Sequence, residues 1–353
     1  MKALPLFPAS IVGSIPRPLV VRELIEKPQW DVSDTATMDA AIRFVVAMQE
    51  RAGLDVVNDG EWRRRSYIGV IAELAHGFTL EINPADGRPW TVVTEKLTPK
   101  PAGFIAAEAA FVKKVATVAS KITLPAPALL GERLWDAERS KKAYPDRDDF
   151  VRACVAPLRG EIALLQDLGV EIVQIDDPHL CLFVDPNVRR KYDNPDRAAD
   201  FAVEMINETV RGFDGIKFAV HLCRRAGARV RGEKHHAGTY GPILEQLNRL
   251  KVQHLTMEFT AAGADDLESL GRLREDFELG LGVVDVTPGA PEAAPIIASR
   301  VERALSKIDK TRITLNPDCG FAPGSAAKVD TDEVYLKLKA EAEAARMLRA
   351  RYA

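Results

Sequence analysis

Eight short runs of apolar and β-branched residues recur along the chain, separated by longer segments whose apolar residues have helical spacing. Strands that alternate with helices pair in parallel, and eight such units close into a (β/α)₈ barrel, or TIM barrel. The runs are almost continuously apolar, as expected of strands buried on both faces. An open, doubly wound sheet is the competing arrangement. The expected strands cover residues 9–13, 54–59, 121–125, 171–176, 216–221, 252–259, 279–286 and 312–317.

The segments between these runs predict amphipathic helices at residues 38–52, 149–168, 200–213 and 294–308. Neither a repeat nor a linker rich in Gly, Ser or Pro divides the chain, so we expect one barrel domain over residues 1–353. Two excursions from the barrel are expected. One is a β-hairpin at about 78–98, around Asn83-Pro-Ala-Asp-Gly87, and the other is a basic loop insertion at about 224–240 that lies over one end.

Composition narrows the class of protein. Hydrophobic residues make up 46% of the 353 residues, which is enough to bury a large core. The formal net charge of −3 argues against a nucleic-acid partner, which demands a basic surface. No apolar run approaches 18 residues and the start lacks a signal-peptide pattern, so we expect a soluble, cytoplasmic protein without a membrane partner. Four cysteines are too few to stabilise a chain of this length through disulfides. We expect those that matter to be metal ligands or nucleophiles.

Ligand-type side chains stand at the carboxyl ends of several expected strands, where barrel enzymes carry their working residues. His221 and Cys223 follow the fifth run, Glu258 ends the sixth, and Cys319 follows the eighth. His221 and Cys223 are two residues apart, so an extended backbone points both the same way. Imidazole, thiolates and a carboxylate suit tetrahedral zinc. The alternative is that each is an ordinary buried side chain.

A second His-Leu-Cys string, at His179 and Cys181, follows Pro178 and is expected to pack in a loop beyond its strand. His235 and His236 lie in the basic insertion and are interpreted as a solvated face.

Carboxylates at strand ends are candidates for acid/base work or for holding an ammonium group. They are Glu61, Asp176, Asp177 and Asp285, and the alternative is a salt bridge to the arginines at 63–65 or a helix cap. Gly13 and Ser14 are expected to offer backbone N–H groups to a substrate carboxylate. The chain has neither a Gly-x-Gly-x-x-Gly strand–helix turn nor a phosphate-binding loop, so nucleotide cofactors have no support.

Together these motifs resemble those of one family, the catalytic domain of cobalamin-independent methionine synthase. They follow the family's order over nearly the whole chain, and the string at 316–320 is the most specific. The shared strings are Val12-Gly13-Ser14 with Pro16, Asp59-Gly60-Glu61, Val173-Gln174-Ile175-Asp176, His221-x-Cys223, Thr256-Met257-Glu258, Gly282-Val283-Val284-Asp285 and Asn316-Pro317-Asp318-Cys319-Gly320.

The resemblance implies a barrel of the methionine synthase and uroporphyrinogen decarboxylase type. It further implies Zn²⁺ held by the positions matched here by His221, Cys223, Glu258 and Cys319, and a thiol substrate, homocysteine. Glu61 and Asp176 would hold the ammonium of that substrate. Its carboxylate would meet the segment of Val12, Gly13 and Ser14, and Asp285 is a further candidate catalytic carboxylate.

The departures from the family concern the methyl donor. Thr287 stands where the family has a histidine, and residues 124–131 lack the family's tryptophan, with Trp135 further on. Methyltetrahydrofolate, a methylcorrinoid carried by a partner protein and a small methyl donor therefore stay open, and the segment 224–240 is a candidate for a donor-contacting lid, the alternative being an idle surface loop. The alternatives are alkyl transfer to another thiol such as coenzyme M, a non-catalytic zinc-binding barrel, and a uroporphyrinogen-decarboxylase-like enzyme without cysteine ligands.

Overall fold

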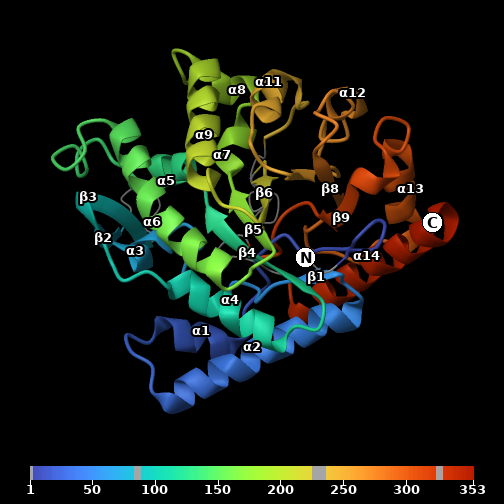
Figure 1. The fold of residues 1–353 in the computed structure, drawn as a ribbon, viewed down its shortest axis with the longest axis horizontal. Helices are drawn as coiled ribbons and strands as arrows, with labels where there is room; N and C mark the ends of the chain where they lie inside the picture. Colours follow the sequence, from blue (N-terminus) through green and yellow to red (C-terminus); the bar gives the residue numbers. More distant parts are fainter. Residues whose placement is uncertain (1–2, 83–88, 225–235, 323–328) are drawn as a thin grey trace.

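The structure, a computed structural model, describes residues 3–82, 89–224, 236–322 and 329–353. Its main sheet is parallel, curled and seven-stranded, with the order β1-β4-β5-β6-β7-β8-β9, and helices surround it (Figure 1). The strands are β1 Val56–Val57, β4 Ala119–Pro125, β5 Ile172–Asp176, β6 Lys217–Leu222, β7 His254–Glu258, β8 Glu278–Val284 and β9 Ile313–Pro317. Seven of the eight expected runs therefore form strands.

The first run differs from the expectation and does not form a strand. Ala9 makes an isolated parallel bridge to Leu315 of β9, and Ser10 makes one to Val56 of β1. The N–H of Ala9 donates to the carboxylate of Asp55, and the N–H of Ser10 donates partly to Glu341. The Ser10 N–H also donates to the carbonyl of Leu315 at 2.9 Å, so the run meets both neighbouring strands, but through single bridges only, and a full eight-stranded barrel is not shown.

The expected hairpin is present as an antiparallel pair outside the main sheet. It consists of β2, Ala75–Ile82, and β3, Pro89–Pro99. In Figure 1 this pair lies at one edge of the molecule beside α3, which leads directly into β2. The expected basic insertion falls largely on residues 225–235, which lie outside the described residues.

All four expected helices are present, with shifted ends. The helix expected at 38–52 begins earlier, because Asp31 and Asp34 form a reciprocal capping box, and it ends at Gly53 in the left-handed conformation. The helices are α1 Leu19–Glu26, α2 Val32–Ala52, α3 Ile71–Leu74, α4 Phe104–Val115, α5 Pro127–Leu134, α6 Arg147–Asp167, α7 Pro178–Leu182, α8 Pro186–Arg189, α9 Pro195–Val210, α11 Leu244–Asn248, α12 Leu267–Leu270, α13 Ala294–Ala304, α14 Thr331–Tyr352, and the 3₁₀ turns η1 Gly241–Ile243 and η2 Lys310–Arg312.

The long C-terminal helix α14 packs against both α13 and α2, so the end of the chain is tied to its beginning. Parallel pairing aligns the carboxyl ends of β5, β6 and β7, with Asp176 beside His221 in the register. Among the described residues, no helix has the length and apolar character needed to cross a membrane. The fold thereby gathers the strand ends at one mouth, where the expected site residues stand.

Candidate active site and metal centre

Three of the four expected metal ligands meet at the mouth of the sheet. His221 comes from β6, Cys223 follows that strand immediately, and Cys319 follows β9. Their ligand atoms all lie within 4.8 Å of one another, and all three side chains are buried. The two sulfur atoms are 3.1 Å apart. Residues almost a hundred positions apart in the sequence are thus brought together by the parallel pairing of the strands.

Asp176 sets the orientation of the His221 ring. Nδ1 of His221 lies 3.0 Å from Oδ1 of Asp176 at the end of the adjacent strand β5. Within the part of the chain that the structure describes, Nε2 of His221 is buried and has no hydrogen-bond partner. A ligand imidazole characteristically donates one N–H to a carboxylate and offers its other nitrogen to the metal. Burial alone lowers the pKa of His221, but the contacts with Asp176 and Cys223 outweigh it and raise the pKa to about 10.

The two thiols also fit a metal ion. None of the four cysteines, all of which lie in the described residues, forms a disulfide. The hydrogen bond to Cys319, together with burial, raises the pKa of the Cys223 thiol well above its usual value. A divalent cation reverses this by favouring thiolates, and two zinc–sulfur bonds of about 2.3 Å at a tetrahedral angle span about 3.8 Å. The donor types therefore fit zinc, and the two sulfur atoms, 3.1 Å apart, would have to separate by about 0.7 Å to bind it at a tetrahedral angle.

Glu258, the expected fourth ligand, ends β7 and is buried. Its Oε1 accepts the backbone N–H of Arg224 at 2.7 Å, and its backbone carbonyl accepts the hydroxyl of Tyr240 at 2.9 Å. Asp318 anchors the loop that follows, because its Oδ1 accepts the N–H of Phe259 at 2.9 Å. Within the described residues the group of mutually close ligand atoms does not include Glu258, so its role as a ligand stays a prediction.

Glu61 has a strained backbone at the site. Its φ is +60°, and the preceding Gly60 has φ +67°. A non-glycine residue in this region costs free energy and persists where the surroundings hold it in place. Here the N–H of Glu61 donates to Oδ1 of Asp59 at 2.9 Å, and the hydroxyl of Thr123 donates to Oε1 of Glu61 at 2.8 Å. A Cβ on Gly13 would lie only 2.8 Å from that same Oε1.

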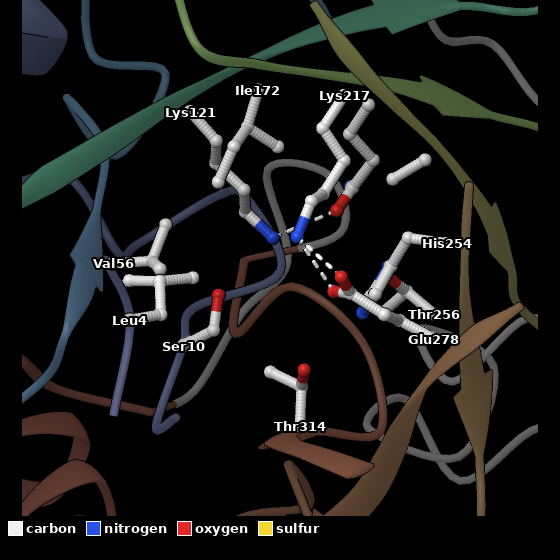
Figure 2. Close-up of a pocket in the computed structure, with 12 residues that line it drawn as sticks. Leu4, Ser10, Val56, Lys121, Ile172, Lys217, His254, Thr256, Glu278 and Thr314 are labelled. Carbon is white, nitrogen blue, oxygen red and sulfur yellow. Dashed lines mark hydrogen bonds and ion pairs between the residues drawn. The ribbon is translucent and has the colours of Figure 1, made fainter. Parts of the chain in front are cut away.

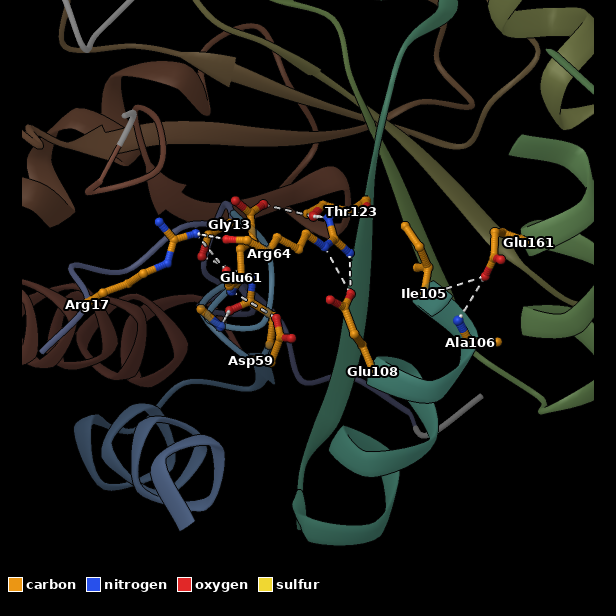
Figure 3. A network of polar contacts seen from close by, with 12 residues as sticks. Gly13, Arg17, Asp59, Glu61, Arg64, Ile105, Ala106, Glu108, Thr123 and Glu161 are labelled. Carbon is orange, nitrogen blue, oxygen red and sulfur yellow. Dashed lines mark hydrogen bonds and ion pairs between the residues drawn. The ribbon is translucent and has the colours of Figure 1, made fainter. Parts of the chain in front are cut away.

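A buried ion pair lies beside Glu61 and contacts Thr123, which donates to Glu61 (Figure 3). Arg64 donates through Nε and Nη2 to Oε2 of Glu108 on α4, at 2.9 and 2.7 Å. Its Nη1 donates to the carbonyl and the hydroxyl of Thr123, at 2.9 and 3.0 Å. The Thr123 hydroxyl therefore accepts from Arg64 and must point its own proton at Glu61. Burial raises the pKa of Glu108 to about 7, against the opposing effect of Arg64.

The carboxylates and the ligand group open into one cleft. Val12, Gly13 and Ser14 line it together with Glu61, Asp176 and the three ligand residues. Gly320 holds the Ser14 loop against the Cys319 loop, because a Cβ there would meet Oγ of Ser14 at 2.3 Å. The cleft measures about 2250 Å³. The structure thus brings together, around one cavity, the residues expected to bind the metal and the thiol substrate.

The other expected residues lie elsewhere. Asp285 is half-buried after β8, accepts the N–H of Thr287 at 2.9 Å, and is not among the described residues that line the cleft. Asp177 accepts the N–H of Leu180 at 2.9 Å, so it caps α7, which was the alternative considered for it.

The two remaining histidine motifs are buried or paired. His179 and Cys181 do pack in the interior, but in the short helix α7 rather than in a loop. The solvated face expected for His236 is incorrect, because its Nδ1 lies 2.8 Å from a carboxylate oxygen of Asp185. His235 lies outside the described residues.

Several site residues were not anticipated from the sequence. Thr123 and Gln174 are single polar side chains inside apolar runs, and their inward direction follows only from the register of β4 and β5. Arg64 was considered only as a salt-bridge partner of the strand-end carboxylates, whereas it is buried and pairs with Glu108. A polar residue within an otherwise apolar barrel strand was the available signal, because a barrel interior normally holds branched aliphatic side chains.

The comparison with known proteins agrees with this geometry. A family model described as the cobalamin-independent synthase catalytic domain matches residues 7–347. The chain belongs to this family. It is therefore a methyltransferase, and the resemblance noted in the sequence is confirmed.

Relatives match over nearly the full length of the chain. A methionine synthase of Saccharolobus islandicus is 30% identical over 334 residues, which cover 91% of this chain and 90% of the relative. One of Pyrococcus furiosus is 26% identical over 344 residues, covering 90% and 87%. A solved B12-independent methionine synthase from Shewanella sp. W3-18-1 has a TM-score of 0.80 at 21% identity, covering 98% of this chain and 99% of that one. The fold is thus shared with a methionine synthase of known structure.

Proposed function

We propose that the chain is a zinc-dependent methyltransferase that methylates the thiol of homocysteine and yields methionine. One observation carries this: the ligand atoms of His221, Cys223 and Cys319 lie within 4.8 Å of one another in a cleft that the buried carboxylate of Glu61 also lines. Glu258 is the proposed fourth ligand. The relatives named methionine synthase support the reaction, and the Shewanella structure is a complex with selenomethionine, an analogue of the proposed product.

The chemistry follows from the donor set. Zinc, when bound, lowers the pKa of a ligating thiol from about 8.5, so that the thiol is deprotonated at neutral pH. The transfer forms a sulfur–carbon bond and breaks the bond between the methyl carbon and the donor, while the thiol proton leaves to solvent or to the donor. Zinc is suited to this role because two thiolate ligands keep the metal electron-rich.

The chain's own residues would hold the amino acid. Burial raises the pKa of Glu61, and the nearby charge of Asp176 raises it further. Two carboxylates that repel each other bind a cation well, so an ammonium group is the expected occupant between them. The backbone N–H groups of the segment from Val12 to Ser14 would face the substrate carboxylate. Asp285 stays a candidate catalytic carboxylate for the part of the site that would bind the methyl donor.

The donor has ample room. Pockets for drug-sized ligands measure about 300–1000 Å³, and the cleft measures about 2250 Å³. Homocysteine fills only part of this volume, and the remaining wall includes the aromatic side chains of Tyr67, Trp135 and Tyr192. Methyltetrahydrofolate, a methylcorrinoid on a partner protein and a small methyl donor are the candidates, and methionine formation with each in turn distinguishes them.

The metal proposal is tested with Cys319→Ser, and Cys154→Ser serves as the control because Cys154 is a buried thiol on α6 outside the cleft. We expect one zinc per chain by metal analysis in the wild type and in Cys154→Ser, and loss of both zinc and turnover in Cys319→Ser. Retention of stoichiometric zinc and full turnover by Cys319→Ser would disprove the assignment. Zinc binding without turnover on any donor would favour the non-catalytic barrel.

The acceptor proposal is tested with Glu61→Gln, which preserves the acceptor for Thr123 but removes the charge. We expect the KM for homocysteine to rise at least tenfold, because the ammonium loses a charged partner worth about 1.5–3 kcal/mol. Zinc content should not change. If coenzyme M, which has no amine, is alkylated by the wild type in preference to homocysteine, the acceptor assignment fails.

A further inference from the structure

A polar cavity lies inside the sheet, near the amino ends of strands β5 to β8 (Figure 2). It measures about 30 Å³, room for about one or two water molecules, and its walls include the buried or half-buried side chains of Lys121, Gln174, Lys217, His254 and Glu278. Barrel interiors are normally filled by branched aliphatic residues. Burying these polar side chains costs desolvation free energy, so we expect the layer that they form to have a role beyond filling space.

Hydrogen bonds lead from this layer to the metal ligand. Nζ of Lys121 donates to Oε1 of Gln174 at 2.7 Å. Nε2 of Gln174 donates to Oδ1 of Asp176 at 2.7 Å and to the carbonyl of Val12 at 3.1 Å. Oδ1 of Asp176 in turn faces Nδ1 of His221 at 3.0 Å. Four side chains on the adjacent strands β4, β5 and β6 therefore form one continuous chain of polar contacts.

The direction of each contact is determined by Lys121, which can only donate, and by the carbonyl of Val12, which can only accept. An ammonium group donates and cannot accept, so the amide oxygen of Gln174 must face Lys121. The amide nitrogen must then face Asp176, which leaves this carboxylate purely an acceptor. Asp176 can consequently accept Nδ1–H of His221, and that tautomer presents Nε2 as a lone-pair donor. A reversed amide would instead place an oxygen against the carboxylate of Asp176.

We propose that Gln174, oriented by Lys121, is a positioning residue that fixes the tautomer and the orientation of His221 as a metal ligand. This inference rests on the metal site of the proposed function. Lys217 provides an internal comparison, because it lines the same cavity but donates to Glu278, at 2.6 and 2.8 Å, and not to Gln174 (Figure 2). Both lysines thus carry an ammonium group and line the same cavity. Only Lys121 donates to Gln174 and is thereby linked to Asp176 and His221.

The test compares Lys121→Met, Gln174→Met and the matched control Lys217→Met in the full chain. Zinc affinity is measured by competition with a chromogenic chelator, and the ligand field is read from the visible absorption of the Co²⁺-loaded protein. Outer-shell partners of metal ligands are worth about 10–100-fold in affinity. We expect about tenfold weaker zinc binding and a shifted cobalt spectrum in Gln174→Met, a smaller change in the same direction in Lys121→Met, and wild-type behaviour in Lys217→Met.

Thermal unfolding of the metal-free proteins separates positioning from folding. Should Gln174→Met fail to fold, Lys121→Met carries the test, because it leaves the amide in place and removes one of the two groups, Lys121 and the carbonyl of Val12, that orient it. Wild-type affinity and an unchanged cobalt spectrum in both variants would overturn the inference, as would an equal loss in Lys217→Met. A wild-type chain that takes up no zinc would overturn the metal site itself and this inference with it.

Discussion

The buried pair of Arg64 and Glu108 offers a quantitative test of how the site is supported. Both side chains are about 2% exposed. Removal of one partner from such a pair leaves an uncompensated buried charge and costs about 3–5 kcal/mol, whereas apolar replacement of both is far less costly. We therefore expect Arg64→Met and Glu108→Leu each to lower the free energy of unfolding by about 3–5 kcal/mol.

The double variant should cost less than the two single variants together. It loses the two hydrogen bonds from Arg64 to Thr123, worth about 1–3 kcal/mol, but it leaves no unpaired charge. The coupling energy of the cycle is thus expected to be at least about 3 kcal/mol. At about 2.1 cal/mol/K of unfolding entropy per residue, each single variant of this 353-residue chain should melt about 4–7 °C lower.

Urea and thermal unfolding followed by circular dichroism supply the cycle, and the KM for homocysteine supplies its functional counterpart. Arg64→Met should raise this KM, because the Thr123 hydroxyl is then free to turn away from Glu61. Glu108→Leu keeps Arg64 on Thr123 and should raise the KM less. Single-variant losses that add to within about 0.5 kcal/mol in the double variant would refute the reasoning, since independent sites are additive.

Three further outcomes follow from contacts at the site. Gly13→Ala should push the carboxylate of Glu61 aside and raise the KM for homocysteine about tenfold at unchanged zinc content, because its Cβ would lie 2.8 Å from Oε1; an unaltered KM would show that Glu61 does not hold the substrate. Gly320→Ala should destabilise the fold by about 1–3 kcal/mol in urea unfolding, because its Cβ would meet the Ser14 backbone N at 3.1 Å as well as the hydroxyl. Burial lowers the pKa of His179 from 6.5 to about 4, so the unfolded chain binds a proton there that the folded chain refuses, and stability falls as the pH drops from about 6.5 to 4. His179→Gln should remove up to about 3 kcal/mol of that loss, which urea unfolding at pH 7 and pH 4.5 measures, and an identical pH slope in both proteins would contradict it.

The sequence predicted those parts of the fold whose residue pattern is local, and it missed those that depend on contacts between distant residues. The runs that became β4 to β9, and the hairpin, were predicted because apolar periodicity and turn residues are local properties of the chain. The run expected as a strand at 9–13 makes only single bridges to its two neighbours, with the Ala9 N–H donating to Asp55 and the Ser10 N–H shared between Leu315 and Glu341. No local pattern reports the presence of such acceptors.

The same distinction applies to the site. His221, Cys223 and Cys319 were predicted to converge because their residue types and their places at strand ends suffice to bring them together. The dependence of His221 on Asp176, and of Glu61 on Thr123, requires knowing which strands are neighbours and in what register. Glu258 and Asp285 show the converse: a correct strand end places a residue near the mouth without determining the direction of its side chain.

Strand β4 shows that residues below the mouth of the sheet also shape this site. Its inward residues Lys121 and Thr123 are two positions apart and so face the same interior. Thr123 supports the carboxylate of Glu61, and Lys121 orients Gln174 and thereby Asp176. The expected carboxylate partners of the substrate ammonium are thus both held by one strand that contributes no ligand itself. Variation at Thr123 should accordingly change the KM for homocysteine at unchanged zinc affinity, whereas variation at Lys121 should change zinc affinity and, through Asp176, that KM as well.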